Sequence, residues 1–307
     1  MNRCLWFCAC TMAIFLLEQN GPGAAQITIE SEEQFAYACT LMEREAYDRA
    51  VDEFERFTYF FADDEKVPEA RYMMGLCRFR AGQYEAAREI CLDLQRDFPT
   101  SPIGGKALIL MGETYYAQGA FAEADRYFKM VVERFPGLEI KNGALYRLGW
   151  SRMQRDQWCE ASETFKEVSP ESPLFTSAKR LSEESRLGEE LPYKVPAAAG
   201  VMAGVLPGLG HAYCERYKDG LVALLLNGLF IWAAYESFEQ DQEVLGGILT
   251  FLELGWYTGN IYSAVNCAHK HNRAVRNKYR QSLLDRFDLS LFSMGGRDLG
   301  LALRLEF

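Results

Sequence analysis

The stretch ALILMGETYYAQGAFAEADRYFKMVVERFP, residues 107–136, carries Leu, Ala, Glu and aromatic side chains at spacings of three and four, which predicts amphipathic helices. The same frame begins at Ala70 and again at Ala144, so three copies start 37 residues apart. An earlier copy, FAYACTLMEREAYDRAVDEF, begins at Phe35. A repeat of this period predicts stacked helical hairpins, each of which contacts mainly its neighbours.

Each copy places small and large residues in the same order. A small residue in the first helix is followed by an aromatic residue after the turn, an alanine, and a bulky residue four positions later. Small residues let the two helices of a hairpin approach closely, and large residues fill the gap to the next hairpin. The small residues are Ala38, Gly75, Gly112 and Gly149; the aromatic residues are Tyr47, Tyr84, Phe121 and Trp158; the alanines are Ala50, Ala87, Ala124 and Ala161; the bulky residues are Phe54, Cys91, Phe128 and Phe165.

This pattern resembles the tetratricopeptide repeat. The resemblance implies an all-α superhelix of about four repeats over residues 31–170, with a spacer slightly longer than the usual length of about 34 residues. The connectors RDFPTSP and ERFPGLEIKNGA also resemble those of envelope repeat proteins, the BamD-like components of outer-membrane assembly and the Tol-Pal coordinator. That second resemblance implies a role in outer-membrane or envelope assembly.

Three positions of each first helix are expected to line the concave face of the superhelix, where such repeats hold peptides or partner helices. Aromatic and Met side chains there suit an apolar peptide or helix, because they bury a large area at modest entropy cost. For any single residue, an ordinary core role is an equal alternative. The predicted partner-binding groove consists of Tyr72, Leu76, Phe79, Ile109, Glu113, Tyr116, Tyr146, Trp150 and Met153.

Residues 1–25 have the layout of a secretory signal peptide. One Arg is followed by an apolar stretch from Cys4 to Leu17 and by small and polar residues that end at Ala25. An uncleaved anchor is the alternative, although the apolar stretch is short for a membrane span. Either interpretation exports the repeats. A lipoprotein signal needs a Cys directly after the apolar stretch, so lipid attachment is not expected.

Composition excludes several function classes. The net charge of -10 argues against nucleic acid, because phosphate binding needs clustered Lys and Arg. The nine cysteines have no CxxC or zinc-ligand spacing, and they are expected to pack as small apolar residues. Motifs for nucleophilic, phosphate or dinucleotide chemistry are missing from the sequence. We therefore expect a non-enzymatic protein without a metal or a cofactor.

The composition changes after the repeats. Residues 171–194 predict a polar capping helix and a linker, since the last repeat of an array needs a solvating partner. Residues 195–268 predict a membrane module of helices: Val195–Cys214 and Leu221–Tyr235 carry no charge, and Val244–Ala268 carries only Glu253. A buried helical hairpin in a soluble domain is the alternative.

The entrance PGLGHAYCERYKDGL, together with the later Asn-Gly, resembles that of small TM2-like membrane hairpins. Glu253 at membrane depth predicts either an ion path or a packing contact with Asn227, Tyr257 or Asn260, and we favour packing. Gly255 and Gly259, four residues apart, are expected to allow close helix contact. The predicted motif of the module is Pro207, Gly208, Gly210, Tyr213, Asn227, Glu253, Gly255, Gly259 and Asn260.

Charge suggests a topology for the module. Basic residues flank the two long apolar runs, and the acidic turn Glu239–Glu243 lies between them. The positive-inside rule places both basic flanks in the cytoplasm. Exported repeats then require a third crossing by Val195–Cys214, with a re-entrant or interfacial segment as the alternative.

Residues 269–307 predict a basic segment followed by a short β-hairpin. Apolar and other residues alternate in DLGLALRLEF at the C-terminus, and Phe287, Leu289 and Leu291 alternate before it. Two strands cannot close a barrel, so pairing with a partner is the simpler expectation.

These features predict a non-enzymatic scaffold in the cell envelope of a bacterium. Its exported repeats are expected to bind protein or peptide partners, and its C-terminal helices to sit in membrane lipid. The alternative is a subunit of a membrane channel or transporter whose repeats serve assembly.

Overall fold

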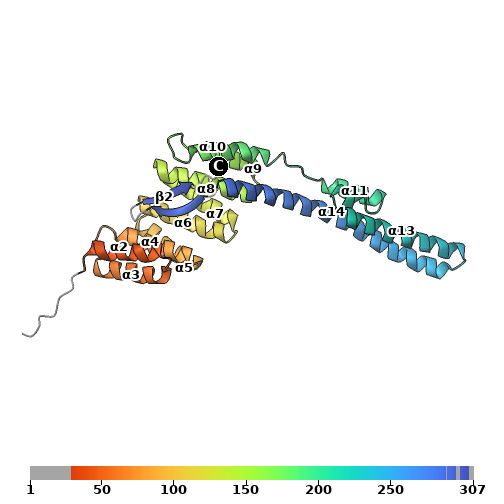
Figure 1. The fold of residues 1–307 in the computed structure, drawn as a ribbon, viewed down its shortest axis with the longest axis horizontal. Coiled ribbons are helices and arrows are strands. Elements are labelled where there is room, and N and C mark those ends of the chain that lie inside the picture. Colours follow the sequence, from red (N-terminus) through yellow and green to blue (C-terminus); the bar gives the residue numbers. More distant parts are fainter. Residues whose placement is uncertain (1–28, 288, 295–297, 304–307) are drawn as a thin grey trace, which may run out of the picture.

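The computed structural model describes residues 29–287, 289–294 and 298–303, so the predicted signal peptide lies outside the described residues. Within these residues, eight helices form four pairs, and each helix packs against the next along the chain (Figure 1). The pairs coincide with the four copies of the sequence repeat and form the predicted all-α superhelix. The pairs are α2 (Ser31–Glu43) with α3 (Tyr47–Phe60), α4 (Val67–Arg80) with α5 (Tyr84–Asp97), α6 (Pro102–Ala117) with α7 (Phe121–Arg134), and α8 (Leu138–Gln154) with α9 (Trp158–Lys166).

The turns inside the four pairs share one backbone geometry. Gly82 and Gly119 have φ angles of 74° and 75°, and the equivalent Glu45 and Asp156 have φ angles of 58° and 61°. Glycine adopts positive φ freely, whereas a residue with a Cβ does so at a cost of about 1–2 kcal/mol. The first and fourth turns therefore carry a strained residue where the two middle turns carry glycine.

The small and large residues of the repeat meet inside each helix pair. A Cβ on Gly112 would lie 2.5 Å from the ring of Phe128, closer than real Cβ contacts allow, and Gly149 has the same geometry in the fourth pair. In the second pair the bulky position holds Cys91, and a Cβ on Gly75 would meet its sulfur at an ordinary 3.5 Å. A Phe ring at the bulky position thus explains the glycine in the third and fourth pairs.

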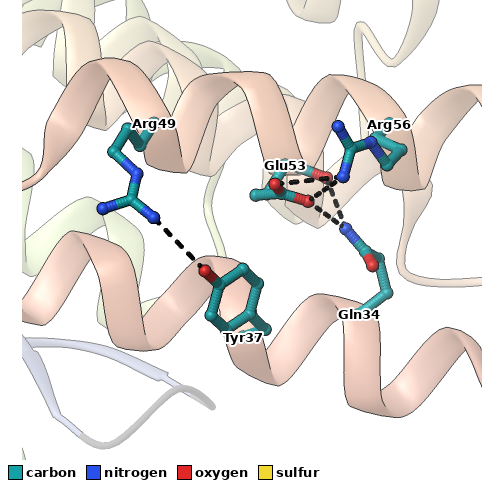
Figure 2. Close-up of polar contacts among 5 residues, drawn as sticks. All are labelled: Gln34, Tyr37, Arg49, Glu53 and Arg56. Carbon is teal, nitrogen blue, oxygen red and sulfur yellow. Dashed lines mark hydrogen bonds and ion pairs between the residues drawn. The ribbon is translucent and has the colours of Figure 1, made fainter. Parts of the chain in front are cut away.

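Polar contacts close the flank of the first helix pair, as Figure 2 shows. Glu53 on α3 accepts hydrogen bonds from Gln34 Nε2 at 2.6 Å and from Arg56 at 3.1 Å. Arg49 donates to the hydroxyl of Tyr37 at 3.4 Å. Polar side chains on this side of the pair suit a surface exposed to solvent.

The chain continues through a cap into a second group of helices. Helix α10 (Phe175–Leu187) packs on α9, where Ser162 Oγ donates to the carbonyl oxygen of Ser182 at 2.9 Å. A linker then leads to α11 (Pro196–Val205) and α12 (Leu209–Tyr213). Helix α13 (Tyr217–Glu239) and the first half of α14 (Glu243–Arg286) form an antiparallel hairpin that extends away from the repeats (Figure 1).

Helix α14 joins the two parts of the molecule. It has 44 residues, a length of about 66 Å at 1.5 Å per residue. The helix does not end with the apolar run at Ala268, because no Gly or Pro interrupts the sequence between Asn260 and Arg286. The basic segment is therefore the second half of this helix, and Figure 1 shows it returning to the repeats.

Two strands follow α14. The strands β1 (Leu289–Met294) and β2 (Asp298–Leu303) pair antiparallel, with Leu291 opposite Leu301. They lie where the alternating sequence predicts a hairpin. Residues 304–307, the last part of the predicted strand pattern, lie outside the described residues.

The steric contact at Gly112 generates a testable prediction. Gly112→Ala should destabilise the chain by about 1–3 kcal/mol, because a Cβ forced against the Phe128 ring displaces the core. Gly75→Ala is the matched control, since its added Cβ makes ordinary contacts and restricts the unfolded chain. Thermal unfolding followed by far-ultraviolet circular dichroism should give a lower midpoint for Gly112→Ala alone. Equal midpoints for the two variants would contradict the pairing.

Candidate functional site

The end of α14 packs into the fourth repeat. Leu283 of α14 and Phe287, the residue directly after the helix, are 0% and 4% exposed. They belong to one buried cluster with Tyr146, Trp150 and Met153, three of the predicted groove residues. This part of the groove is therefore occupied by a helix from the same chain.

Polar contacts surround this buried cluster. Arg280 donates to the backbone carbonyl oxygen of Gln154 at 2.6 Å. Arg276 and Arg280 contact the Asp156 carboxylate at 3.0 and 3.5 Å. Asp156 occupies the strained turn position that is glycine in the two middle repeats. The contact with two arginines offsets the strain of a residue other than glycine at this turn.

A second polar contact joins α14 to the capping helix α10. Arg286 lies 2.8 Å from one oxygen of Glu184, and the Tyr279 hydroxyl donates to the other at 2.7 Å. Burial favours the neutral carboxyl, but the hydrogen bonds from Arg286 and Tyr279 outweigh it and hold the pKa of Glu184 below its ordinary value. Burial raises the pKa of Tyr279, so its hydroxyl stays protonated and able to donate.

The other predicted groove residues are also largely enclosed. Tyr72 and Leu76 are 4% and 0% exposed and belong to the core of the first three repeats. Phe79, Ile109 and Tyr116 are partly buried and keep some exposed surface. Most of the residues predicted for the groove are therefore enclosed, as the alternative core role implies, and their part in partner binding stays a prediction. Residues at these positions pack between neighbouring repeats, and only part of the set reaches the surface.

Glu113, the one acidic residue of the predicted groove, forms an ion pair between repeats. It is 3% exposed, and both of its oxygens accept hydrogen bonds from Arg147 of the next repeat. The guanidinium of Arg147 also lies over the ring of Tyr116, 4.4 Å from its centroid. A paired carboxylate of this kind fixes the stacking of α6 on α8 and is not free to bind a partner.

The docking of α14 overturns the predicted three-crossing topology. Its C-terminal half contacts the repeats, so repeats and basic segment lie on the same side of any membrane that the hairpin enters. Helix α11 has 10 residues, about 15 Å, which is half the hydrocarbon thickness of a bilayer. It packs along α14, where a Cβ on Gly200 would lie 2.9 Å from Val265.

The entrance motif builds a tight corner between α11, α12 and α13. Gly208 has a φ of 88°, and a Cβ there would lie 2.0 Å from the carbonyl oxygen of Gly220. A Cβ on Gly210 would lie 2.1 Å from the carbonyl oxygen of Ala199. Pro207 precedes these glycines between α11 and α12. Only glycine allows this approach of the helices.

The linker before α11 is fixed to the middle of α14. Asn272 accepts a hydrogen bond from the Lys194 backbone N–H and donates to the Lys194 carbonyl oxygen, both at 2.8 Å. The Tyr213 hydroxyl accepts from the Val195 backbone N–H at 3.1 Å. The repeats and the hairpin are thus joined at two places along the same helix.

The polar residues of the module are buried and incompletely paired. Asn227, Glu253 and Asn260 are 0%, 7% and 6% exposed. Within the described part of the chain, Asn227 Oδ1, Asn260 Oδ1 and both carboxylate oxygens of Glu253 have no hydrogen-bond partner. Tyr257 donates instead to the carbonyl oxygen of Gly204 at 3.0 Å. The expected hydrogen bond from Glu253 to Asn227, Tyr257 or Asn260 is therefore absent.

The two glycines of the module face open space. No described atom outside the local helix backbone lies within 4 Å of a Cβ built on Gly255 or Gly259. The expected close helix contact at these positions does not occur within the chain. It occurs at Gly246 instead, where a Cβ would lie 2.9 Å from the Phe238 ring.

The hairpin exposes most of its apolar side chains. By length and composition α13 is long and apolar enough to cross a membrane, and 17% of its most apolar window is buried. This exposure is opposite to what the buried bundle of a soluble domain requires. The exposed residues include Leu221, Leu225, Leu229 and Trp232 on α13, and Val244, Ile248, Phe251, Leu252 and Leu254 on α14.

The comparison with protein families supports the assignment of the repeats. Residues 69–101 and 106–137 match the family model of the tetratricopeptide repeat. No curated protein matches the sequence. Among solved structures, TPR-like repeats from Podosopora anserina, described as a kinesin light chain, are 15% identical, with a TM-score of 0.43 over 52% of this chain and 86% of that chain. A tetratricopeptide repeat protein from Parabacteroides merdae is 13% identical, with a TM-score of 0.41 over 83% and 97%.

The repeats indicate a general function in binding other proteins. Tetratricopeptide repeats typically hold other proteins, so the matched repeats indicate a protein-interaction scaffold. Among the described residues, no three His, Cys, Asp or Glu side chains cluster with the geometry of a metal site. Five of the described cysteines are buried and Cys159 is exposed, all as free thiols.

Asp156 offers a test of the docked helix. Asp156→Gly should relieve backbone strain and yet loosen α14, because the carboxylate that binds Arg276 and Arg280 is lost. Glu45→Gly is the matched control, since it relieves the same strain at the first turn. Amide hydrogen exchange of residues 276–286 should rise several-fold in Asp156→Gly, a change on the order of 1 kcal/mol. Unchanged exchange in both variants would show that the arginines do not hold the helix.

Glu184 predicts a pH dependence of the same contact. Its pKa is lowered in the folded chain, so the contact stabilises docking above the ordinary value of 4.5 and loses that effect as pH falls through the lower, folded value. Exchange of residues 279–286, corrected for its intrinsic pH dependence, should accelerate below about pH 4.5 in the natural chain. Glu184→Gln should remove this pH dependence. A transition that persists in the variant would assign the effect to another group.

Proposed function

We propose that the chain is a membrane-anchored scaffold of a bacterial cell envelope, in which tetratricopeptide repeats recruit protein partners and a helical hairpin holds them at a bilayer. The single observation that carries this proposal is the course of α14. One uninterrupted helix lies beside α13 in an apolar hairpin and ends in the core of the fourth repeat. Such a helix fixes the distance and orientation of the repeats relative to the anchor.

The exposed apolar surface of the hairpin supports the membrane assignment. Helix α13 has 23 residues, about 34 Å, which matches the hydrocarbon thickness of a bilayer. Leu225 and Phe251 are 62% and 76% exposed on the two helices, without a covering element among the described residues. Contiguous apolar surface of this extent marks a membrane or protein contact. The TM2-like entrance motif agrees with a two-crossing hairpin.

We expect the first three repeats to bind the partner proteins. The fourth repeat already holds α14, which leaves Phe79, Ile109 and Tyr116 as the predicted groove residues with exposed surface. Tyr116 also forms an edge contact with Phe121, with ring centroids 5.2 Å apart, so its ring is held in one orientation. Rigid, partly exposed aromatic side chains suit an apolar segment of a partner protein.

Two observations disagree about the side of the membrane on which the repeats lie. The signal-like segment at residues 1–25 supports export of the repeats, as does the resemblance of the connectors to envelope assembly proteins. The docked α14 brings the basic residues of its second half to the side of the repeats, and the positive-inside rule assigns such flanks to the cytoplasm. We place the repeats on the exported side, because a cleavable signal acts first.

The alternative of a channel or transporter subunit finds less support. It depends on Glu253 as part of an ion path. Glu253 faces the inside of the hairpin but does not line the cleft between α12, α13 and α14. Two helices enclose no continuous path across a bilayer.

Fractionation with protease accessibility tests the proposed function. The chain should resist carbonate extraction, and in intact cells with a permeabilised outer membrane a protease should cleave the connector between α5 and α6. A tag inserted in the acidic turn Glu239–Glu243 should be protected in the same sample and cleaved only after lysis. Release by carbonate would overturn the anchor, and protection of the connector would place the repeats in the cytoplasm.

A further inference from the structure

A cleft lies between α12, α13 and α14 at the end of the hairpin nearest the repeats. Its volume is about 600 Å³, within the range of small-molecule sites. None of the groove, docking or anchoring features described above uses this cleft. Whether it is a site depends on the side chains that line it.

The cleft is polar at one end and apolar at the other. His211, Arg216 and Ser263 line the end toward the repeats. Leu226 and Trp256 line it toward the middle of the hairpin. Along α14 the change takes place between residues 256 and 263, a rise of about 10 Å. This polarity gradient follows the direction from the surface of a bilayer into its interior.

The polar end retains unused hydrogen-bonding capacity. His211 is 5% exposed, and its Nε2 lies 3.0 Å from Ser263 Oγ, while its Nδ1 has no partner among the described atoms. Burial lowers the pKa of His211, so the ring is neutral at pH 7 and one nitrogen can donate while the other accepts. Asn260, which also lines the cleft, has an unpartnered Oδ1. Buried polar atoms without partners are costly, and because both lie just beneath the cleft surface, a small opening or a bridging water would let a ligand satisfy them.

Arg216 supplies the positive charge of the cleft. Its Nε contacts Asp219, another lining residue, at 2.5 Å. This ion pair leaves the four N–H groups on the two Nη nitrogens available to a phosphate. Asp219 in turn offers an acceptor for a hydroxyl or amine. The polar end thus combines donors for phosphate with acceptors for a second headgroup.

The apolar end is open because of two glycines. Gly255 and Gly259 line the cleft, and a Cβ on either would meet no described atom within 4 Å. The missing side chains leave an open channel along this part of α14. The apolar residues of α13 form its other wall.

We propose that this cleft binds one glycerophospholipid, with its phosphate at Arg216 and His211 and an acyl chain over Gly255 and Gly259. The headgroup carries a hydroxyl or amine that donates to Asn260 or Asp219. This inference rests on the proposed membrane anchor. Basic pockets between membrane helices are known to hold lipid headgroups. A helix of a second copy could pack on the glycines, but its apolar surface would leave the polar end of the cleft unsatisfied.

Lipid retention by the purified full chain tests the site. The chain is delipidated in detergent, incubated with phosphatidylglycerol and examined by native mass spectrometry. The natural chain should keep one phosphatidylglycerol per molecule. Gly259→Leu should lower retention at least about tenfold, because its side chain fills the channel. Gly247→Leu is the matched control: this glycine also faces open space on α14 but does not line the cleft, so retention should stay unchanged.

Arg216→Gln and a second lipid probe the headgroup contacts. Arg216→Gln should weaken retention without closing the channel. Phosphatidylcholine, which has a phosphate but no headgroup donor, should bind more weakly than phosphatidylglycerol. Equal retention of both lipids would overturn the assigned contacts of Asn260 and Asp219.

Two results would overturn the site as a whole. The first is a natural chain that keeps no more lipid than Gly259→Leu. The second is a natural chain that is dimeric while Gly259→Leu is monomeric, which would assign the glycines to a second copy. Failure of the anchor itself is distinguishable, because carbonate would then release the natural chain from membranes before any lipid assay. A carbonate-resistant chain without bound lipid would overturn the lipid site alone.

Discussion

Burial of the last turns of α14 in the fourth repeat is the contact on which the arrangement of the two halves depends. Leu283 is fully buried there, although it lies more than 100 residues after the residues of the repeats and cap in its cluster. Replacing such a residue by a smaller one typically costs 2–5 kcal/mol, so burial of this kind can hold a long helix in place. Without it, polar contacts such as those of Arg276 and Arg280 with Asp156, and the linker contact between Lys194 and Asn272, would have to join the repeats to the hairpin.

The docked helix also changes what the repeats can do. In an unoccupied superhelix, Tyr146, Trp150 and Met153 would present apolar surface to a partner, whereas here Leu283 and Phe287 share their cluster. The fourth repeat has become part of the connection to the hairpin, and the first three repeats retain the surface for other proteins. Its turn residue shows the same division of roles. Asp156 has a strained backbone with a positive φ, and its carboxylate contacts two arginines of α14.

The hairpin is organised by close packing at one end and by open surface at the other. Gly208, Gly210 and Gly220 bring α12, α13 and their neighbours into contacts that no larger residue would permit. Further along, no described atom outside the local helix backbone lies within 4 Å of a Cβ built on Gly255 or Gly259. The same residue type therefore closes the corner in one place and opens a cleft in the other. In the proposed membrane anchor, lipid would cover the open surface and fill the cleft.

The sequence by itself determined the repeats. A period of 37 residues, with small and large residues at fixed positions, is a local pattern, and each copy forms its own helix pair. It also indicated the helical hairpin, because uncharged runs are visible without knowledge of contacts. Only the tertiary structure decided that α14 continues past Ala268 and returns to the repeats, which excludes the three-crossing topology. It also decided that most of the predicted groove is buried. Both results depend on contacts between residues far apart in the chain, and neither periodicity nor composition carries information about such contacts.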